Sequence, residues 1–151
     1  MSSSCPISNR RIDSHLVRLI SLQVLVWSLF FIVTQSLFFT LVILFDFTVR
    51  LVRKESYSPF TQVGKFILKQ WSALPRYTDE SPKRFALYLG FVMGVITPLF
   101  ALFGWSPAAV AVASVLMICA FIEVLFDFCI GCKIYYAIQL FKVIKYDRNF
   151  H

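Results

Sequence analysis

The chain has 151 residues, of which 58% are hydrophobic and only 15% charged, with a mean hydropathy of +0.73. A soluble domain usually carries about 45–50% apolar and about 25% charged residues, so the composition indicates a membrane protein. The net charge of +7 could suggest a nucleic-acid-binding protein. That class is excluded because the cations flank apolar segments and no basic run alternates with exposed aromatics. Attraction to anionic lipid headgroups explains the charge more simply.

Four apolar segments, in chain order, predict an all-α membrane protein with four transmembrane helices arranged as two hairpins, in a single domain over 1–151. The helices are expected at about 16–36, 37–54, 84–103 and 107–128. Only Gln35 and Ser36 join the first two. One continuous helix is the alternative there, but its charge-free stretch is too long for one untilted crossing.

Two further helices are expected outside the apolar segments. Between the hairpins, apolar residues recur at helical spacing over about 59–74, which is typical of an amphipathic helix lying in the headgroup plane. Ser58 is a plausible cap for this helix and Pro59 its first residue. After the fourth segment, 133–146 forms either an extension of the last transmembrane helix or a second interfacial helix.

The positions of the cations predict the orientation of the chain. All 15 lysines and arginines precede the first segment, lie between the second and third, or follow the fourth. Neither short connection within a hairpin carries one. Because positive loops stay in the cytoplasm, we expect a multi-pass protein of the bacterial inner membrane with both termini in the cytoplasm, embedded in the lipid bilayer.

The cysteines are the first candidate site. Cys129 and Cys132 form a Cys-x-x-Cys pair at the expected cytoplasmic end of the fourth helix, and Cys5 is expected on the same side. A permanent disulfide is not expected in the reducing cytoplasm. Three interpretations stay open: thiol or persulfide exchange with Cys5 as a third thiol, binding of a soft metal ion by Cys5, Cys129 and Cys132, or packing at a helix end. Cys119, in mid-membrane, is expected to be a core residue.

Carboxylates within the apolar segments form the second candidate site. Glu123 and Asp127 are four residues apart, so they share a helix face and are candidates for proton handling. Asp46 has Arg50 one turn later, which predicts a structural ion pair. For all three carboxylates the alternative is a clamp that only holds the helices together. The repeated Leu-Phe-Asp-Phe at 44–47 and 125–128 could reflect a duplication or the biased composition.

Several segments together resemble a bacterial membrane family catalogued as domain of unknown function 4395. The segments are Cys5-Pro6-Ile7, Asp13 with Arg18, Tyr57-Ser58-Pro59, Pro82-Lys83-Arg84-Phe85 and Phe128-Cys129-Ile130-Gly131-Cys132-Lys133. The resemblance implies that Cys5, Cys129, Cys132, Asp46, Glu123 and 82–85 are motif residues. The family brings no established activity, but the association of its members with thioredoxin-like and sulfurtransferase proteins implies thiol or sulfur chemistry.

The leading hypothesis is therefore a membrane thiol protein that exchanges electrons or sulfane sulfur with a thioredoxin-like or sulfurtransferase partner. Cys129 and Cys132 would be the exchanging pair. No cofactor is predicted, although a soft metal ion fits the second interpretation. The alternatives are an oligomer that transports or binds a small sulfur species or soft metal ion, and an accessory subunit of a larger membrane complex. Phosphate-binding loops and hydrolase motifs are missing from the sequence.

Overall fold

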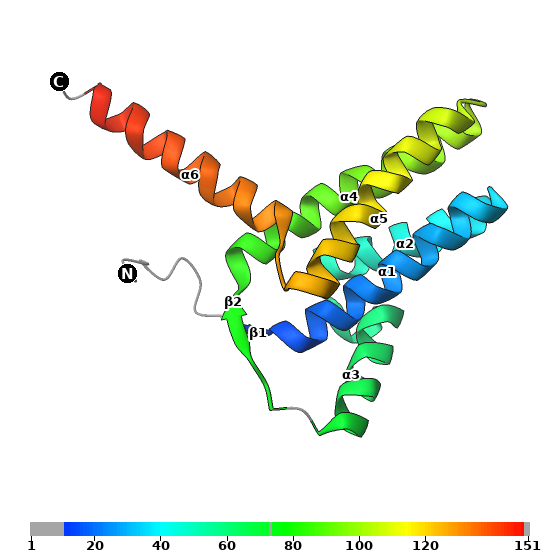
Figure 1. The fold of residues 1–151 in the computed structure, drawn as a ribbon, viewed down its shortest axis with the longest axis horizontal. Helices are drawn as coiled ribbons and strands as arrows, with labels where there is room; N and C mark the ends of the chain where they lie inside the picture. The colour runs from blue at the N-terminus through cyan, green and yellow to red at the C-terminus, as the bar shows by residue number, and fades with distance from the viewer. Residues whose placement is uncertain (1–10, 73, 150–151) are drawn as a thin grey trace.

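The structure is a computed structural model that describes residues 11–72 and 74–149. Cys5 lies outside the described residues. Apart from two paired strands of three residues each, the regular structure is helical, which confirms the all-α class (Figure 1). The elements in chain order are β1 (Arg11–Asp13), α1 (Ser14–Thr34), α2 (Leu37–Leu51), the 3₁₀-helix η1 (Glu55–Tyr57), α3 (Pro59–Trp71), β2 (Tyr77–Asp79), α4 (Glu80–Leu102), α5 (Ser106–Phe126) and α6 (Ile130–Arg148).

Among the described residues, three helices are long and apolar enough to cross a membrane: α1, residues 82–102 of α4, and α5. Helix α2 is equally apolar but has only 15 residues, which span about 22 Å at 1.5 Å per residue. That length is short of a hydrocarbon core of about 30 Å. The structure is therefore that of a helical membrane protein with three candidate spans, and α2 is too short to be counted among them.

Helices α1, α2, α4 and α5 pack as one bundle rather than as two separate hairpins. The most extensive contacts join α1 to α5, α4 to α5 and α2 to α4, whereas α1 and α2 touch less (Figure 1). Buried Ile20, Val24, Ile43 and Phe47 form much of the core. Many large apolar side chains instead point outward, as expected for surfaces that face lipid.

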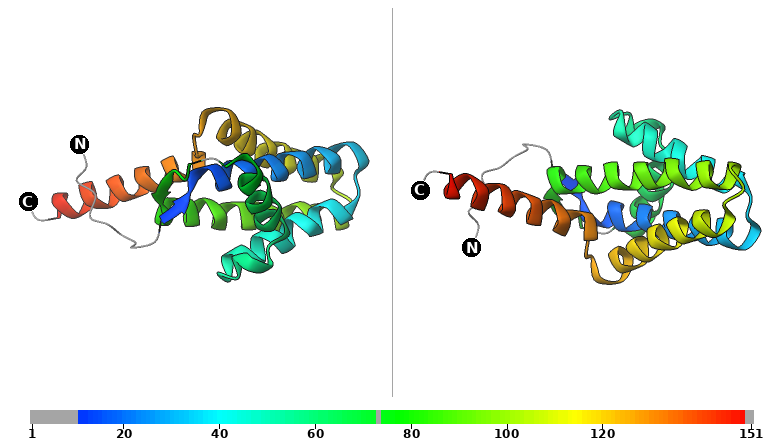
Figure 2. Two further views of the ribbon diagram at one scale, coloured as in Figure 1. Left: turned by 90° about the horizontal axis from the view of Figure 1, so that it is seen from below. Right: turned by 90° about the horizontal axis from the view of Figure 1, so that it is seen from above.

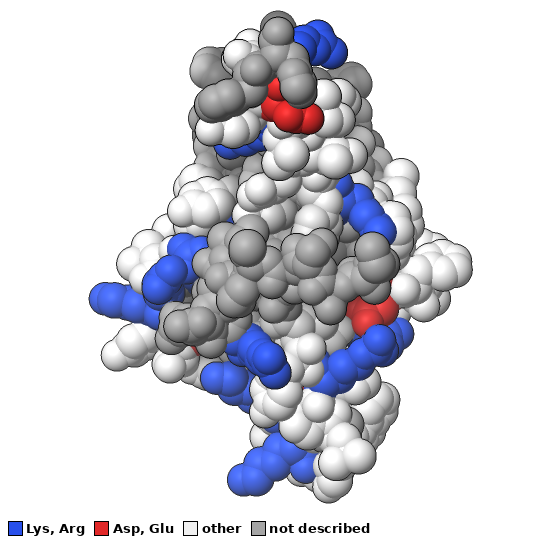
Figure 3. All heavy atoms as spheres, turned by 90° about the vertical axis from the view of Figure 1, so that its left-hand side faces the viewer, with Lys and Arg blue, Asp and Glu red and all other residues white. Residues whose placement is uncertain are grey.

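The two ends of the bundle differ in charge. The α1–α2 and α4–α5 connections lie together at one end (Figure 1) and contain no lysine or arginine. The other end, here called the basic end, carries the starts of α1 and α4, the ends of α2 and α5, and the strand pair. Figure 3 views the molecule from this side and shows lysine and arginine side chains around it. One end of the bundle thus holds the cationic surface.

Helix α5 does not continue into the C-terminal helix. It ends at Phe126, and Asp127 adopts the left-handed conformation with φ of 51°, while its N–H donates to the Glu123 carbonyl at 3.0 Å. Asp is among the few residues that tolerate this conformation. After the break, α6 begins at Ile130 and extends away from the bundle in another direction (Figures 1 and 2). The separate helix, not the extension, is therefore what the chain forms.

The strand pair was not predicted from the sequence. Strands β1 and β2 are antiparallel, with Ile12 opposite Thr78, and the N–H of Ser14 donates to the Arg76 carbonyl at 2.7 Å. Three residues per strand are too few for a recognisable alternation of polar and apolar side chains. The pair joins the start of α1 to the segment that leads into α4, so residues near Arg11 lie beside the start of α4.

Helix α3 is fixed to the bundle by a buried carboxylate. Asp46 of α2 is only 1% exposed and forms an ion pair with Arg50 at 2.6 Å. It also accepts hydrogen bonds from the Ser58 hydroxyl and from the N–H of Phe60 (3.2 Å). Ser58 in turn caps α3 by accepting from the N–H of Thr61. Asp46 thus links α2 to the first turn of α3.

Candidate thiol site

Cys129 caps the N-terminus of α6. Its sulfur accepts a hydrogen bond from the N–H of Cys132 at 3.3 Å, the position at which a serine or aspartate oxygen usually caps a helix. Cys129 is half-buried, whereas Cys132 is buried in the first turn. The unpaired N–H groups of a helix start carry partial positive charge, which stabilises a thiolate placed there. The break at Asp127 creates this helix start and so creates the site.

The pKa values of the two thiols are shifted in opposite directions. A hydrogen bond from the Cys132 thiol lowers the pKa of Cys129, and the backbone N–H of Cys132 and the Lys83 ammonium contribute in the same direction. The same thiol–thiol hydrogen bond, together with burial, raises the pKa of Cys132. Since the thiolate is the reactive form, these opposite shifts favour Cys129 over Cys132 as the thiolate of the pair.

Gly131 allows the start of α6 to lie directly against α4. A Cβ atom at position 131 would lie 2.6 Å from the Ala86 Cβ and 2.8 Å from its Cα, closer than carbon atoms approach without bonding. Only glycine fits between the two cysteines at this contact. This role of Gly131 was not predicted from the sequence. A glycine inside a Cys-x-x-Cys pair does indicate a close approach of the backbone to another element.

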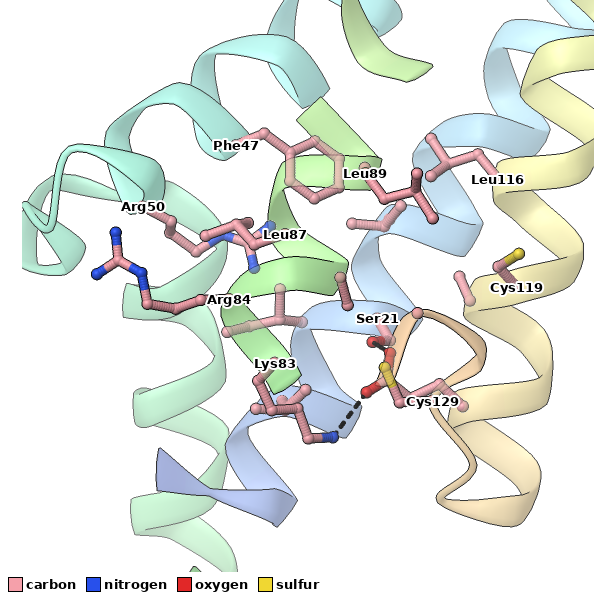
Figure 4. A pocket seen from close by; sticks show the side chains of 18 of the residues that line it. Ser21, Phe47, Arg50, Lys83, Arg84, Leu87, Leu89, Leu116, Cys119 and Cys129 are labelled. Carbon is pink, nitrogen blue, oxygen red and sulfur yellow. Dashed lines mark hydrogen bonds and ion pairs between the residues drawn. The ribbon is translucent and has the colours of Figure 1, made fainter. Parts of the chain in front are cut away.

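Glu123 is held by two partners from other helices. It forms an ion pair with Lys83 of α4 (3.0 Å) and accepts a hydrogen bond from the Ser21 hydroxyl of α1 at 2.8 Å. Figure 4 shows Lys83, Ser21 and Cys129 close to one another in this part of the bundle. The Lys83 and Glu123 side chains are about one-eighth exposed, at 13% and 15%. The structure therefore brings Glu123 and Lys83 to the thiol pair.

Asp127 takes different partners from Glu123, although the two were expected to share a helix face. It accepts from the Ser14 hydroxyl at 3.0 and 3.1 Å and lies 3.8 Å from the exposed Arg76. Arg18 of α1 also lies near this break and donates to the Val124 carbonyl at 2.6 Å. Asp127 therefore joins α1 to the break between α5 and α6.

Two hollows meet at the thiol site. The inner cavity, of about 190 Å³, lies among α1, α2, α4 and α5 and is lined mainly by apolar side chains, with Cys119 among them. The outer hollow, of about 680 Å³, lies at the basic end and is lined by polar residues that include Asp127 and Cys132. Cys129 and Lys83 line both hollows. A thiolate at Cys129 can therefore be approached from outside the bundle and from within it.

Within residues 11–72 and 74–149, no group of three or more histidine, cysteine, aspartate or glutamate side chains is arranged to hold a metal ion. The expected metal ligand set included Cys5, which is not among these residues. The described chain supplies Cys129 and Cys132, so the metal interpretation depends on a third ligand from elsewhere.

The fold and the site together define a helical membrane protein with a paired-cysteine site at the basic end of its bundle. The model of the family described as "Domain of unknown function (DUF4395)" matches residues 12–139, and the chain belongs to this family, as its sequence motifs predicted. No curated protein and no solved structure matches the chain significantly.

Proposed function

We propose that the protein is a membrane thiol-exchange protein in which Cys129 is the attacking thiol and Cys132 the resolving thiol. The observation that carries this proposal is the place of Cys129 at the N-cap of α6, with buried Cys132 one turn behind it. A helix N-terminus and a nearby cation are the two environments that most often activate a cysteine. Cys129 has both, because Lys83 lines the same hollows.

The exchange of electrons requires two steps. The Cys129 thiolate attacks one sulfur of a partner disulfide, a mixed disulfide forms, and the partner's other sulfur leaves as a thiolate. Cys132 then loses its proton and attacks the Cys129 sulfur, which releases the partner's second thiolate. The partner gains two electrons and this chain keeps a Cys129–Cys132 disulfide. In the reverse direction, a reduced partner returns two electrons to this disulfide and leaves with its own disulfide formed.

Transfer of sulfane sulfur would use the same nucleophile. The Cys129 thiolate attacks the outer sulfur of a partner persulfide, the partner leaves as a thiolate, and Cys129 carries the persulfide. Cys5 would be the third thiol. Cys5 is six residues before Arg11, and Arg11 lines the outer hollow. Six extended residues span about 20 Å, which sets how far Cys5 can lie from that hollow. Asp127 and Glu123 would handle the protons, Asp127 in the outer hollow and Glu123 through its contact with Lys83.

The proposed partner is a soluble thioredoxin-like or sulfurtransferase protein of the cytoplasm. For this to hold, the basic end must face the cytoplasm of a bacterial cell, with α2 as a fourth crossing of the inner membrane. The cation distribution supports that orientation. The exposed Arg53 and Lys54, which follow α2, can reach the headgroups from a short helix, and this supports the crossing.

The inner cavity favours a second candidate function, the binding or transport of a small sulfur species by an oligomer. A cavity of about 190 Å³ can hold such a species beside Cys129. A protein that stays monomeric in detergent and in nanodiscs would count against transport. The third alternative is an accessory subunit of a larger membrane complex. It predicts that replacing both cysteines leaves the role of the protein unchanged.

The proposed function is tested with protein purified anaerobically in nanodiscs and treated with 5,5′-dithiobis(2-nitrobenzoate), an aromatic disulfide. Alkylation mass spectrometry should find a Cys129–Cys132 disulfide in the wild type and a mixed disulfide on Cys129 in Cys132→Ser. Cys129→Ser should react at least about tenfold more slowly, because it lacks the activated thiolate. Cys119→Ser is the matched control and should behave as the wild type.

Two results would contradict thiol exchange. Equal reactivity of Cys129→Ser and the wild type would show that Cys129 is not the activated thiol. Stoichiometric metal in elemental analysis of the purified protein, lost in Cys129→Ser, would establish the metal interpretation instead.

A further inference from the structure

The inner cavity reaches from the thiol site toward the lipid-facing surface of the bundle. At one end its wall includes Cys129 and Lys83. At other points it is lined by Leu89 of α4 and Val115 of α5, which are 38% and 45% exposed on apolar helices of the bundle. Outward-facing side chains of such helices contact lipid. The cavity therefore has one edge at the reactive thiol and another at the lipid-facing surface.

Polar side chains line this cavity beside Cys129 and also away from it, where Arg50 pairs with Asp46 and Arg84 donates to the Leu51 carbonyl. The Lys83 ammonium uses one bond for Glu123 and has three donors in all, so it can donate to a further oxygen. Figure 4 shows Lys83 and Ser21 grouped near Cys129, with Leu89 and Leu116 on the opposite side. The cavity thus suits an apolar ligand that carries oxygen acceptors on one side.

We propose that the inner cavity binds the ring of a lipid-soluble quinone, which exchanges two electrons with the Cys129–Cys132 pair. The inference rests on the proposed thiol function and names its membrane partner. An apolar cavity of about 150 Å³ is known to hold benzene, so about 190 Å³ accommodates a substituted six-membered ring. A dithiol gives up two electrons, and a quinone is a lipid-soluble acceptor of the same number.

An acyl chain of a lipid fits the observations less well. It would occupy the apolar part of the cavity but would offer no acceptor to the Lys83 ammonium on the inner side, where Lys83 lies beside Cys129. A quinone carbonyl next to Lys83 supplies that acceptor and also places a ring carbon near the Cys129 sulfur. The two hollows then have two roles, with the soluble thiol partner in the outer hollow and the quinone in the inner cavity.

Reduction of the quinone by the thiol pair takes two steps. The Cys129 thiolate adds to a ring carbon, a C–S bond forms, and negative charge moves onto the carbonyl oxygen next to Lys83. Cys132 loses its proton and attacks the Cys129 sulfur, so the S–S bond forms, the C–S bond breaks and its electron pair returns to the ring. Two protons, equal in number to those of the two thiols, end on the ring oxygens. Dithiol and quinone give disulfide and hydroquinone.

The experiment mixes reduced protein in nanodiscs, without oxygen, with decylubiquinone, whose fully substituted ring reacts poorly with free thiols. We expect one quinone reduced per chain, measured by loss of its ultraviolet absorbance, together with a Cys129–Cys132 disulfide found by mass spectrometry. The Cys129→Ser, Cys132→Ser double variant measures the background. A rate equal to that background would overturn the proposal.

Cavity-filling variants test where the quinone binds. Leu116→Trp and the milder Ala120→Leu extend side chains that line the cavity and should slow quinone reduction at least about tenfold, as changes of a methylene or more do in apolar pockets. Phe103→Trp, an exposed position beyond α4, is the matched control and should keep the wild-type rate. Thermal melting shows which variants are folded. Unchanged rates in both folded cavity variants would also overturn the proposal.

The outcome is distinguishable from failure of the thiol function itself. Protein that reacts with the aromatic disulfide but does not reduce decylubiquinone would keep the thiol function and refute the quinone site. Protein inert to both reagents would refute both. A cavity occupied by a tightly bound acyl chain, seen by native mass spectrometry and not displaced by decylubiquinone, would also refute the quinone site.

Discussion

The carboxylates at the basic end show how single residues are stabilised in this protein. Glu123 takes partners 40 and 102 positions away in the sequence, and Asp127 takes Ser14, 113 positions away. An ionised carboxylate loses hydration when it is buried, so it must find donors within the fold. Asp46 and Arg50, four residues apart on α2, form a pair that helix geometry could predict.

At this scale we predict that Lys83→Met lowers the free energy of unfolding by about 3 kcal/mol, because it leaves the Glu123 charge buried with only Ser21 as partner. Titration with a denaturing detergent measures this change. Lys83→Met combined with Glu123→Leu removes both charges and should be more stable than the single variant. Strictly additive effects would show that the two side chains do not interact.

We also predict that the alkylation of the two cysteines has different pH dependences. Because the pKa of Cys129 is lowered by the Cys132 thiol and that of Cys132 is raised, iodoacetamide should label Cys129 at a pH at which Cys132 stays protonated and unlabelled. Peptide mass spectrometry across a pH series measures both profiles.

The control for this prediction is Cys132→Ala. It removes the thiol that is the main cause of the lowered pKa of Cys129. The thiolate fraction at a given pH then falls, so the labelling profile of Cys129 must move to higher pH. Coincident profiles of Cys129 and Cys132 in the wild type would contradict the assigned asymmetry.

At the scale of elements, the break between α5 and α6 positions the site. The left-handed Asp127 ends α5, and the helix restarts with Cys129 as its cap. Gly131 then lets the first turn of α6 press against α4. Without the break the two cysteines would lie inside a helix, where the backbone N–H groups are already paired and cannot stabilise a thiolate.

Gly131→Ala should therefore destabilise the protein by about 1–3 kcal/mol, the usual cost of overpacking, since its new methyl group would lie against Ala86. The displaced turn should also slow alkylation of Cys129 at pH 7. Adding Ala86→Gly removes one of the two close atoms and should restore part of the stability. No change in either measurement would show that α6 is not seated as described.

Asp46→Asn tests the link between α2 and α3. The variant keeps the size of the side chain but replaces the carboxylate with a neutral amide. The carboxylate pairs with Arg50 and accepts hydrogen bonds from the Ser58 hydroxyl and the Phe60 N–H. We expect α3 to detach more often and chymotrypsin to cut faster in residues 57–66. Lys65→Gln, on the exposed face of α3, should be cut at the wild-type rate. Equal cutting rates would indicate that Asp46 does not hold α3.

For the whole molecule, the open question is how often the chain crosses the membrane. Three helices are long enough, and α2 is the short one. If α2 also crosses, both termini and the thiol site share one side. If it does not, the chain crosses three times and its two ends lie on opposite sides of the membrane, so the cations near one end lie on the side opposite to that expected.

Fusions of alkaline phosphatase and green fluorescent protein, expressed in a bacterium, distinguish these cases. Phosphatase should be active after Gln35 and after Gly104 and inactive at the C-terminus, and fluorescence should show the reverse. Active phosphatase at the C-terminus would place the thiol site outside the cytoplasm and exclude a cytoplasmic thioredoxin-like partner.

The sequence by itself determined the membrane class, the family, the positions of the helices to within a few residues and the Cys-x-x-Cys pair. Length of apolar runs, helical periodicity and charge distribution are local properties, so they can be read along the chain. The start of α3 at Pro59 was predicted for the same reason, because proline and a capping serine act within one turn.

Only the tertiary structure decided what surrounds the cysteines. The pairing of Lys83 with Glu123, the contact of Gly131 with Ala86 and the meeting of two hollows at Cys129 all join residues from separate helices. Such contacts depend on how the helices are packed and rotated against one another. Sequence spacing carries no information on that rotation, so no motif could have shown that the thiol pair faces both the basic end and an apolar cavity.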